Sequence, residues 1–478
     1  MCQPMPLSSA YRPDPQFMTL GAEFADPVRP ADFPQATLRF RNDRAAATVG
    51  LEALDDAEWR AAFARFEPLA GAQPPLAMRY HGHQFRTYNP DLGDGRGFLF
   101  AQLREAGSDR LLDLATKGSG RTPWSRGGDG RLTLKGGVRE VLAAEMLEAL
   151  GVPTSRAFSL IETGEALQRN DEPSPTRSAV LTRLSHSHIR FGTFQRHAFE
   201  GRADNINRLI DHVIEAYYRA LAGLEGEARV VALLEAVVGA SARLTAAWMA
   251  AGFVHGVLNT DNQNVTGESF DYGPYRFLPH NDPGFTAAYF DQTGLYSFGR
   301  QPEAVFWNLQ QLAGALSLVA EPAALVTTLA GFSGAYREAL VAAMFARLGL
   351  RRRGDDDDTA LVGAAFTALA EGGEALRWEP FFFDWFGGPA SEARALSSPR
   401  AALYAGEAFT ALRARWKNYE PDRPARLAHP RFARPEPEEL LYDEIEQIWT
   451  AIDGDDDWTP FSCKIAAIRE AGAAWGLG

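Results

Sequence analysis

The sequence predicts an α+β protein with two lobes, a strand-rich first half and a helical second half. Two patterns carry this prediction. Short apolar runs bounded by glycines and polar residues are typical of strands, whereas long runs with apolar residues at helical spacing are typical of helices. Strands are expected in 97–103, 111–117, 156–163 and 178–184, and helices in 57–66, 137–150, 204–223 and 228–252. A polar loop follows the last of these helices, so we expect a cleft between the lobes.

Length and composition limit the class of protein. The chain has 478 residues, which suggests two or three domains, or one two-lobed enzyme with an appendage. The balance of 48 basic and 61 acidic residues, a net charge of −13, argues against nucleic acid as a partner. The two cysteines, Cys2 and Cys463, form no disulfide framework or zinc motif and fit a reducing compartment. We see no secretory signal and no run of 18 apolar residues, so we expect a cytoplasmic protein without a membrane partner.

The chain divides into four expected segments. Residues 1–55 are Pro-rich and are expected to form an irregular arm on the surface. Residues 56–192 would form the strand-rich lobe, and residues 193–350 the helical lobe with the polar loop. Residues 351–478 would be a helical C-terminal extension. Its acidic runs, GDDDDTA and DGDDDW, are expected to be solvated turns, because they lack the spacing of a calcium loop.

A glycine-rich segment precedes the first strand of this lobe. It runs DLGDGRG and contains Gly93, Gly95 and Arg96. Glycines allow a backbone to approach a phosphate or a nucleotide ring closely. The same Gly-Asp-Gly is also common in hairpin turns, so the segment alone leaves both interpretations open.

A lysine and a glutamate follow in an order that favours nucleotide binding. Lys117 ends the strand LLDLATK, and Glu140 lies in the first turn of the helix expected over 137–150. A strand lysine followed by a helix glutamate is the order of the ion pair that fixes the phosphate-binding lysine in protein kinases. The alternative is a surface lysine and a glutamate that caps a helix.

Several arginines could bind phosphates. Arg121, Arg126 and Arg131 alternate with glycines in the loop 118–131, and guanidinium groups match phosphate oxygens. A solvated loop would look similar. Arg183 and Arg190 flank the segment SHSHI, where they are either surface charges or further ligands of a polyphosphate.

The polar loop 253–273 carries the residues expected to bind a metal. Asn262 offers a neutral oxygen and Asp271 an ionised one, a set that suits Mg²⁺ completed by substrate phosphates and water. His255 and Asn262 are seven residues apart, as in the catalytic loop of protein kinases, and Asp271-Tyr272-Gly273 is a version of Asp-Phe-Gly. Val257 stands where kinases place their catalytic base. The alternative is an ordinary turn, since Asn and Asp favour turns for backbone reasons.

Taken together, these segments resemble the selenoprotein O family (SelO, called YdiU in bacteria). The matching segments span roughly 76–316: HQF with DLGDGRG, KGSGRTPWSRGGDGR, VREVLAAEMLEALGVPTSRAFSLIETGE, VLTRLSHSHIRFGTF, HGVLNTDNQNVTGESFDYGPYRFL and YSFGRQPEAVFWNLQQLA. The resemblance implies a protein-kinase-like two-lobed fold of the pseudokinase type. It also implies transfer of AMP from ATP to Ser, Thr or Tyr hydroxyls of proteins, with Mg²⁺ or Mn²⁺, and an ATP orientation reversed relative to kinases.

The resemblance also implies a role for each matching residue. Asp261 would accept the hydroxyl proton, while Asn262 and Asp271 would hold the metal. Glu140 would pair with Lys117. The residues that contact ATP would be Gly93, Gly95, Arg96, Lys117, Asp129, Gly130, Arg183, Arg190 and Asp271.

The chain also departs from the family pattern. The first 50 residues and those after about 350 are expected to match the family poorly. Cys463 has no cysteine close in sequence, which argues against redox control through a disulfide. Two other functions remain open: an atypical kinase that transfers the γ-phosphate, and a non-catalytic ATP-binding protein. We expect a monomer.

Overall fold

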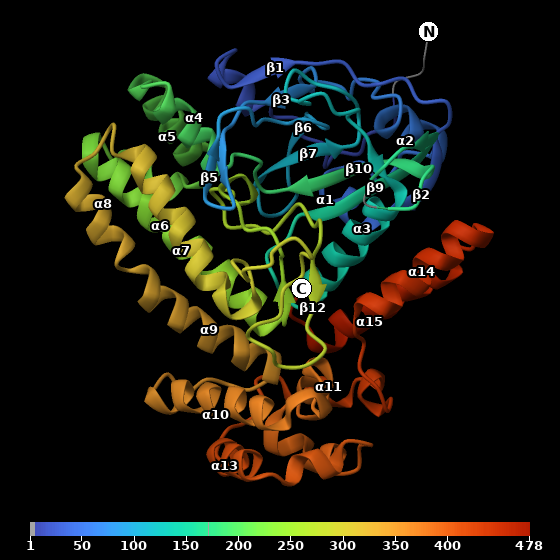
Figure 1. The fold of residues 1–478 in the computed structure, drawn as a ribbon, viewed down its shortest axis with the longest axis vertical. Helices are drawn as coiled ribbons and strands as arrows, with labels where there is room; N and C mark the ends of the chain where they lie inside the picture. The colour runs from blue at the N-terminus through green and yellow to red at the C-terminus, as the bar shows by residue number, and fades with distance from the viewer. Residues whose placement is uncertain (1–4, 171) are drawn as a thin grey trace.

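The computed structural model describes residues 5–170 and 172–478 and has an α+β fold, as the sequence predicts. An antiparallel sheet lies at one end of the molecule, and helices form the rest (Figure 1). The strands in spatial order are β1 (Ala25–Pro27), β3 (Leu76–Met78), β6 (Leu99–Arg104), β7 (Leu111–Lys117), β10 (Thr176–Ser185), β9 (Arg156–Leu167) and β2 (Thr37–Arg41), with β8 (Leu132–Thr133) also paired with β10.

Both faces of the sheet are buried, each against different helices. Side chains alternate between the faces along a strand, so Leu99 belongs to the same core as helix α3 (Leu134–Ala149), while Phe98 and Phe100 belong to the core on the opposite side. That opposite side is covered by α1 (Asp43–Thr48) and α2 (Asp56–Phe63). Burial on both faces makes the sheet a rigid support for the loops at its edges.

The N-terminal segment is less irregular than expected. It supplies β1, which pairs with β3, and β2, which pairs with β9, so it forms both edges of the sheet. Phe17 and Phe24 are buried in the main core. These strands escaped prediction because they are short and flanked by proline and charged residues, which hide a period of two.

Helices α4 to α9 form one side of the molecule (Figure 1). Helix α6 is long and apolar enough to cross a membrane by length and composition, although Glu235 and Arg243 interrupt its apolar run. However, 61% of its most apolar window is buried inside the fold, so packing accounts for this character. The bounds are α4 (Phe191–Phe199), α5 (Ala203–Tyr217), α6 (Gly226–Ala250), α7 (Gln301–Leu316), α8 (Pro322–Leu329) and α9 (Phe332–Leu348).

The C-terminal region is helical, as predicted. Helix α15 returns to the strand-rich end, where Arg469 forms an ion pair with Glu145 of α3 at 2.7 Å. The helices are α10 (Asp356–Gly372), α11 (Trp378–Asp384), α12 (Glu392–Ala395), α13 (Glu407–Trp416), α14 (Tyr442–Asp455) and α15 (Thr459–Trp475).

The prediction of solvated turns for the two acidic runs of this region is correct only in part: most of these carboxylates are exposed, but residues 356–358 lie in the first turn of α10 and residues 453–455 at the end of α14. Asp358 lies buried in the first turn of α10, where it accepts hydrogen bonds from the backbone of Arg353 and Gly354. Asp456 ends α14, where Arg177 and Arg39 hold the pKa of this carboxyl at about 2. Both carboxylates fix local structure.

Candidate active site

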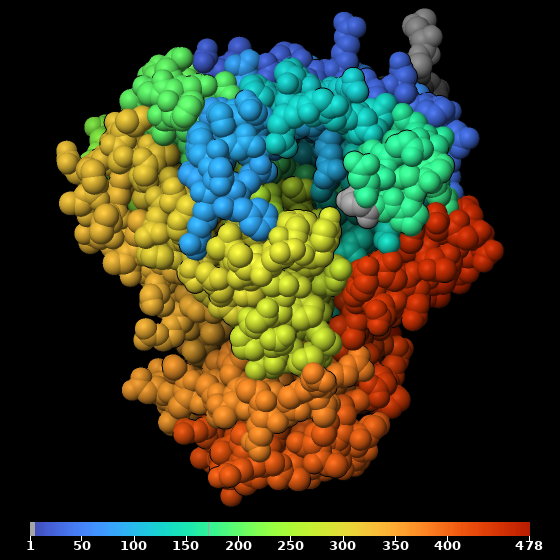
Figure 2. All heavy atoms as spheres, in the orientation of Figure 1, coloured from blue at the N-terminus to red at the C-terminus, as the bar shows by residue number. Residues whose placement is uncertain are grey.

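A cleft of about 680 Å³ opens between the sheet and the loop that follows α6. Figure 2 shows it as a hollow between the blue and teal strand-rich half and the yellow-green loop region. Every site residue predicted from the sequence lines this cleft except Glu140, which lies behind Lys117. The predicted residues in the lining are Gly93, Gly95, Arg96, Lys117, Asp129, Gly130, Arg183, Arg190, Asp261, Asn262 and Asp271.

Lys117 and three other charged residues form one buried cluster at the back of the cleft. From the end of β7, Lys117 donates hydrogen bonds to both Glu140 and Asp271. Arg183 of β10 lies 3.3 Å from Asp271 and 3.6 Å from Glu140. Two cations and two carboxylates therefore neutralise one another in a region that excludes most water.

Glu140 does not occupy the first turn of its helix, which corrects the sequence prediction. Helix α3 begins at Leu134, capped by the Thr133 side chain, so Glu140 lies in the second turn. The glycines at the start of α3 obscured this beginning. Gly137 packs closely on the sheet, since a Cβ there would lie 2.5 Å from the end of the Leu160 side chain of β9. Glu140 is thus held by the packing of α3 on the sheet, without help from the helix dipole.

Asp271 stays ionised in this cluster. Burial alone would raise the pKa of Asp271, but Lys117, Arg183, Arg190 and Arg96 hold it well below its usual range. Its backbone has φ 66°, in the left-handed region that aspartate tolerates better than most residues. The side chain is thereby presented between the cations and the cleft.

A short pair of strands closes the base of the loop between the two halves. Helix α6 leads into β11 (Phe253–Val254), which pairs with β12 (Arg276–Phe277). Within the loop, His255 forms a hydrogen bond with the carbonyl oxygen of Phe270 at 3.0 Å. The amide nitrogen of Asn262 donates to the carbonyl oxygen of Val257 at 2.9 Å, which leaves its side-chain oxygen available.

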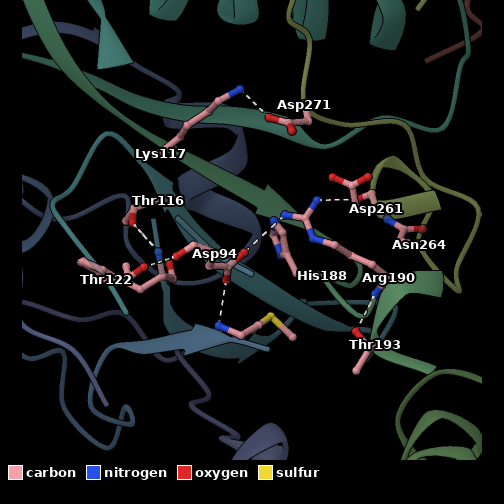
Figure 3. A network of polar contacts seen from close by, with 12 residues as sticks. Asp94, Thr116, Lys117, Thr122, His188, Arg190, Thr193, Asp261, Asn264 and Asp271 are labelled. Atoms are coloured by element: carbon pink, nitrogen blue, oxygen red, sulfur yellow. Dashed lines mark hydrogen bonds and ion pairs between the residues drawn. The ribbon is translucent and has the colours of Figure 1, made fainter. Parts of the chain in front are cut away.

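Asp261 is buried near Asp271 but lacks cations on its carboxylate. One carboxylate oxygen, Oδ1, is buried without a hydrogen-bond partner, and burial raises the pKa of Asp261 to about 6 although Arg190 opposes the shift. Arg190 instead donates to the backbone oxygen of Asp261 at 2.6 Å. Figure 3 shows this contact, with no marked contact on the Asp261 carboxylate. A buried carboxylate with a pKa near neutrality is suited to accept a proton.

Asp94 is a cleft residue that the sequence analysis missed. Its carboxylate accepts from the backbone of Met78 at 3.0 Å and lies 3.4 Å from Arg190 (Figure 3). Thr122 donates to its backbone oxygen at 2.6 Å. Asp94 thus joins the glycine segment to Arg190 and, through it, to Asp261. The sequence signal that could have identified Asp94 is its position within Gly-Asp-Gly, but this tripeptide is equally typical of an ordinary turn.

The glycines at 93 and 95 are explained by packing against Trp124. A Cβ on Gly93 would lie 2.4 Å from the Trp124 ring, and one on Gly95 would lie 2.9 Å from its carbonyl oxygen. The glycine segment and the loop 118–131 therefore lie in direct contact. Gly130 has φ 72°, and a Cβ there would lie 2.3 Å from the backbone of Gly120.

The arginines of the loop 118–131 all reach the cleft, but they differ in their partners. Arg131 forms an ion pair with Glu165 at 2.9 Å. Asp129 is paired with Arg169 at 2.7 Å. Arg121 and Arg126 are exposed at the rim of the cleft. The rim cations add positive charge on the side that faces solvent.

Comparison with known proteins identifies the family. The sequence profile described as "Protein adenylyltransferase SelO" matches residues 7–469. The chain is 47% identical over 467 residues to "Protein nucleotidyltransferase YdiU" of Gloeobacter violaceus, covering 96% of this chain and 95% of that protein. It is 45% identical over 479 residues to the protein of the same description from Synechocystis sp., covering 95% and 97%. The chain belongs to the SelO family.

Membership extends over nearly the whole chain and makes the protein an enzyme, a nucleotidyltransferase. The expectation that the two ends match the family poorly is therefore wrong. Those ends carry few conspicuous polar motifs and supply scaffold elements such as β1, β2 and α15. Cys463 is exposed and free, whereas Cys2 lies outside the described residues.

The oxygen donors of this SelO-family cleft fit a divalent cation. Asn262 turns its amide nitrogen toward Val257, and Asp271 remains ionised, so each can supply one oxygen. Among the described residues no group of three or more His, Cys, Asp or Glu could hold a metal. A site with two protein oxygens matches Mg²⁺, which keeps waters and takes its remaining ligands from substrate phosphates.

Proposed function

We propose that the protein transfers AMP from ATP to Ser, Thr or Tyr hydroxyls of other proteins and releases pyrophosphate. The observation that carries this proposal is the contrast within the cleft. Asp271 is surrounded by cations, whereas nearby Asp261 keeps a buried, unpartnered carboxylate oxygen. The family's description as protein adenylyltransferases supports AMP as the transferred group and protein as the acceptor.

The reaction forms one bond and breaks one bond. The acceptor oxygen bonds to the α-phosphorus of ATP, and the bond between that phosphorus and the oxygen leading to the β-phosphate breaks. Pyrophosphate leaves with the electron pair, while the hydroxyl proton passes to the Asp261 carboxylate. A base at this place substitutes for the one that kinases carry where Val257 stands.

The remaining cleft residues bind and orient the substrates. Lys117, fixed by Glu140, and Arg183 and Arg190 would neutralise phosphate oxygens, because charge stabilisation is the main need of phosphoryl and nucleotidyl transfer. The loops around Gly93, Gly95 and Arg96 and around Asp129 and Gly130 would hold the nucleotide. Asn262 and Asp271 would hold Mg²⁺, or Mn²⁺ as the alternative ion, which would supply further positive charge at the phosphates.

The arrangement of the lobes, the division into segments, the cellular location and the oligomeric state are also part of the proposal. We assign a protein-kinase-like arrangement of two lobes, supported by the order Lys117, Glu140, Asn262 and Asp271 around one cleft. The division into segments 1–55, 56–192, 193–350 and 351–478 follows from it. We also propose a cytoplasmic monomer that acts on proteins and not on nucleic acids or membranes.

ATP labelled at either the α- or the γ-phosphate tests this function. After incubation with Mg²⁺ and a protein acceptor, the α label should stay on the acceptor and the γ label should leave as pyrophosphate. Retention of the γ label would make the protein a kinase. Retention of neither label, with ATP bound, would make it a non-catalytic nucleotide-binding protein.

A further inference from the structure

An aromatic patch lies at the mouth of the cleft. It consists of Phe85 at the tip of the hairpin β4–β5 (Gly82–Gln84 and Thr87–Asn89) and of Tyr289 and Phe290 in the loop before α7. Phe85 and Phe290 have ring centroids 5.8 Å apart, and Tyr289 and Phe290 have centroids 5.2 Å apart. The three residues are 37%, 81% and 46% exposed in chain order. Three neighbouring exposed aromatic rings on one surface are typical of an interaction site.

The hairpin that presents Phe85 adopts an unfavourable backbone conformation. Phe85 has φ 49° and Arg86 has φ 64°, and these two residues connect the paired strands β4 and β5. Two-residue hairpin turns with both φ values positive strongly favour Asn-Gly or Gly-Gly. A bulky aromatic residue in the left-handed region is unusual and is more often found at functional sites. Folding alone therefore does not explain Phe85 at this position.

The patch is connected directly to the catalytic loop. Asn259, two residues before Asp261, accepts hydrogen bonds from the Phe85 backbone nitrogen at 3.1 Å and from the Tyr296 hydroxyl at 2.9 Å. Tyr296 packs against Phe85 with centroids 5.0 Å apart. Asn259 itself lines the cleft. The patch thus begins where the cleft ends, on the side of Asp261.

The charged side chains beside the patch are paired with one another. Arg86 pairs with Glu303 at 3.1 Å, and Glu303 also pairs with Arg300 at 3.3 Å. The cations expected to hold phosphates lie instead on the glycine segment, on the loop 118–131 and on the strands. Figure 2 shows the light-blue hairpin meeting the yellow-green loop at the edge of the hollow. A nucleotide in the cleft would leave this edge free.

We infer that Phe85, Tyr289 and Phe290 bind the segment of the protein substrate that carries the acceptor hydroxyl. The segment would place an apolar or aromatic side chain on the patch and its hydroxyl next to Asp261. This inference rests on the proposed function and adds a preference among acceptors. Burial of aromatic rings gives large contact area with few rotatable bonds, which suits a weak and transient substrate complex.

Two synthetic peptides of equal length and net charge test the inference. Each carries one serine, flanked in the first by phenylalanine and leucine and in the second by alanines. With labelled ATP, the wild-type enzyme should show a KM for the first peptide about tenfold lower than for the second. The double variant Tyr289→Ala/Phe290→Ala should raise the first KM to the level of the second, with kcat and the affinity for ATP unchanged.

Matched variants separate docking from folding. Tyr289→Phe keeps the ring and should keep the preference between the peptides. Val326→Ala removes an exposed apolar side chain of α8, remote in sequence from the patch, and should have no effect. Equal KM values for the two peptides in the wild type, or an unchanged preference in the double variant, would overturn the inference.

Two further results would each remove the docking role of the patch. A wild type that transfers the α label to neither peptide nor to any protein would refute the proposed function itself, and the docking inference with it. Light scattering could also show that the wild type is a dimer and the double variant a monomer. The patch would then be an interface between copies of the chain, and the docking inference would be wrong although the proposed function stood.

Discussion

Asp261 and Asp271 lie in the same cleft, yet their surroundings differ in charge. Asp271 accepts hydrogen bonds from Lys117 and Arg183, and these cations together with Arg190 and Arg96 hold its pKa well below the usual range despite its burial. Asp261 receives no hydrogen bond on Oδ1, and burial raises its pKa to about 6. Arg190 affects the pKa of both residues. Its hydrogen bond to Asp261 goes to the backbone oxygen and not to the carboxylate.

This contrast assigns different tasks to the two carboxylates. A pair of acidic groups whose environments separate their pKa values is how one site provides both a fixed negative charge and a proton acceptor. Asp271 therefore suits a cation and the phosphates around it, whereas Asp261 suits the acceptor hydroxyl. Substitutions at and around the two residues test this division of roles.

The largest effect is expected from Asp271→Asn. The change removes the charge that balances Lys117 and Arg183, and it replaces an ionised ligand of the metal with a neutral amide oxygen. AMP transfer should fall by about 10³-fold or more, measured with ATP labelled at the α-phosphate. The thermal unfolding temperature should also fall, because two buried cations lose a partner. A transfer rate within tenfold of wild type would show that the Asp271 carboxylate is not essential for the metal and the phosphates.

Asp261→Asn should lower transfer by about 10²- to 10³-fold, because the hydroxyl loses its proton acceptor. Its effect on stability should be opposite to that of Asp271→Asn. An unpartnered buried carboxylate is unfavourable, so its neutral amide should leave the unfolding temperature unchanged or raise it. Differential scanning fluorimetry beside the labelling assay gives both values. A large loss of stability would mean that Asp261 has a structural role.

Glu140→Gln should lower transfer by about 10- to 100-fold, because Lys117 loses the partner that orients it. Glu145→Gln is a matched control on the same helix. Glu145 is also buried and ion-paired, but its partners are Arg469 of α15 and Arg44 of α1, outside the cleft. The control should lose stability and keep its transfer rate. Equal losses of transfer in the two variants would show that the effect of Glu140 is only structural.

The smallest effect is expected at Glu268, a half-buried carboxylate on the same loop. Burial raises the pKa of Glu268 to about 7, with Arg156 and Arg110 opposing the shift and Asp113 adding to it. Between the model-peptide pKa near 4.3 and this value, the folded state binds more protons than the unfolded state. The contribution of Glu268 to stability therefore decreases as the pH rises through this range. Glu268→Gln should flatten the change in urea midpoint between pH 5 and pH 7, and an unchanged slope would contradict the assignment.

Much of the site could be predicted from the sequence because its residues lie in polar motifs of fixed order. Lys117, Asn262 and Asp271 stand where strand, loop and turn patterns place them, and the structure brings them to one cleft. Asp94 could not be found in this way, because its role depends on Arg190, which is 96 residues away in the chain.

The fold was predictable where the periodicity is long and unbroken. The expected strands 111–117 and 178–184 and the helix 228–252 lie within two residues of the bounds of β7, β10 and α6. The edge strands β1 and β2 were missed because pairing with distant strands, and not local pattern, makes them extended. The start of α3 was predicted too late in the chain. Gly137, which packs closely against Leu160, weakens the helical pattern of the sequence at this point.

Binding of Mg·ATP to Asp261→Asn and Asp271→Asn, measured by titration calorimetry, tests the division of roles most directly. The account predicts that Asp261→Asn binds with a Kd within about threefold of wild type and keeps its dependence on Mg²⁺, whereas Asp271→Asn loses that dependence. If Asp261→Asn weakened Mg·ATP binding as much as Asp271→Asn does, the two carboxylates would share one role and the account would be contradicted.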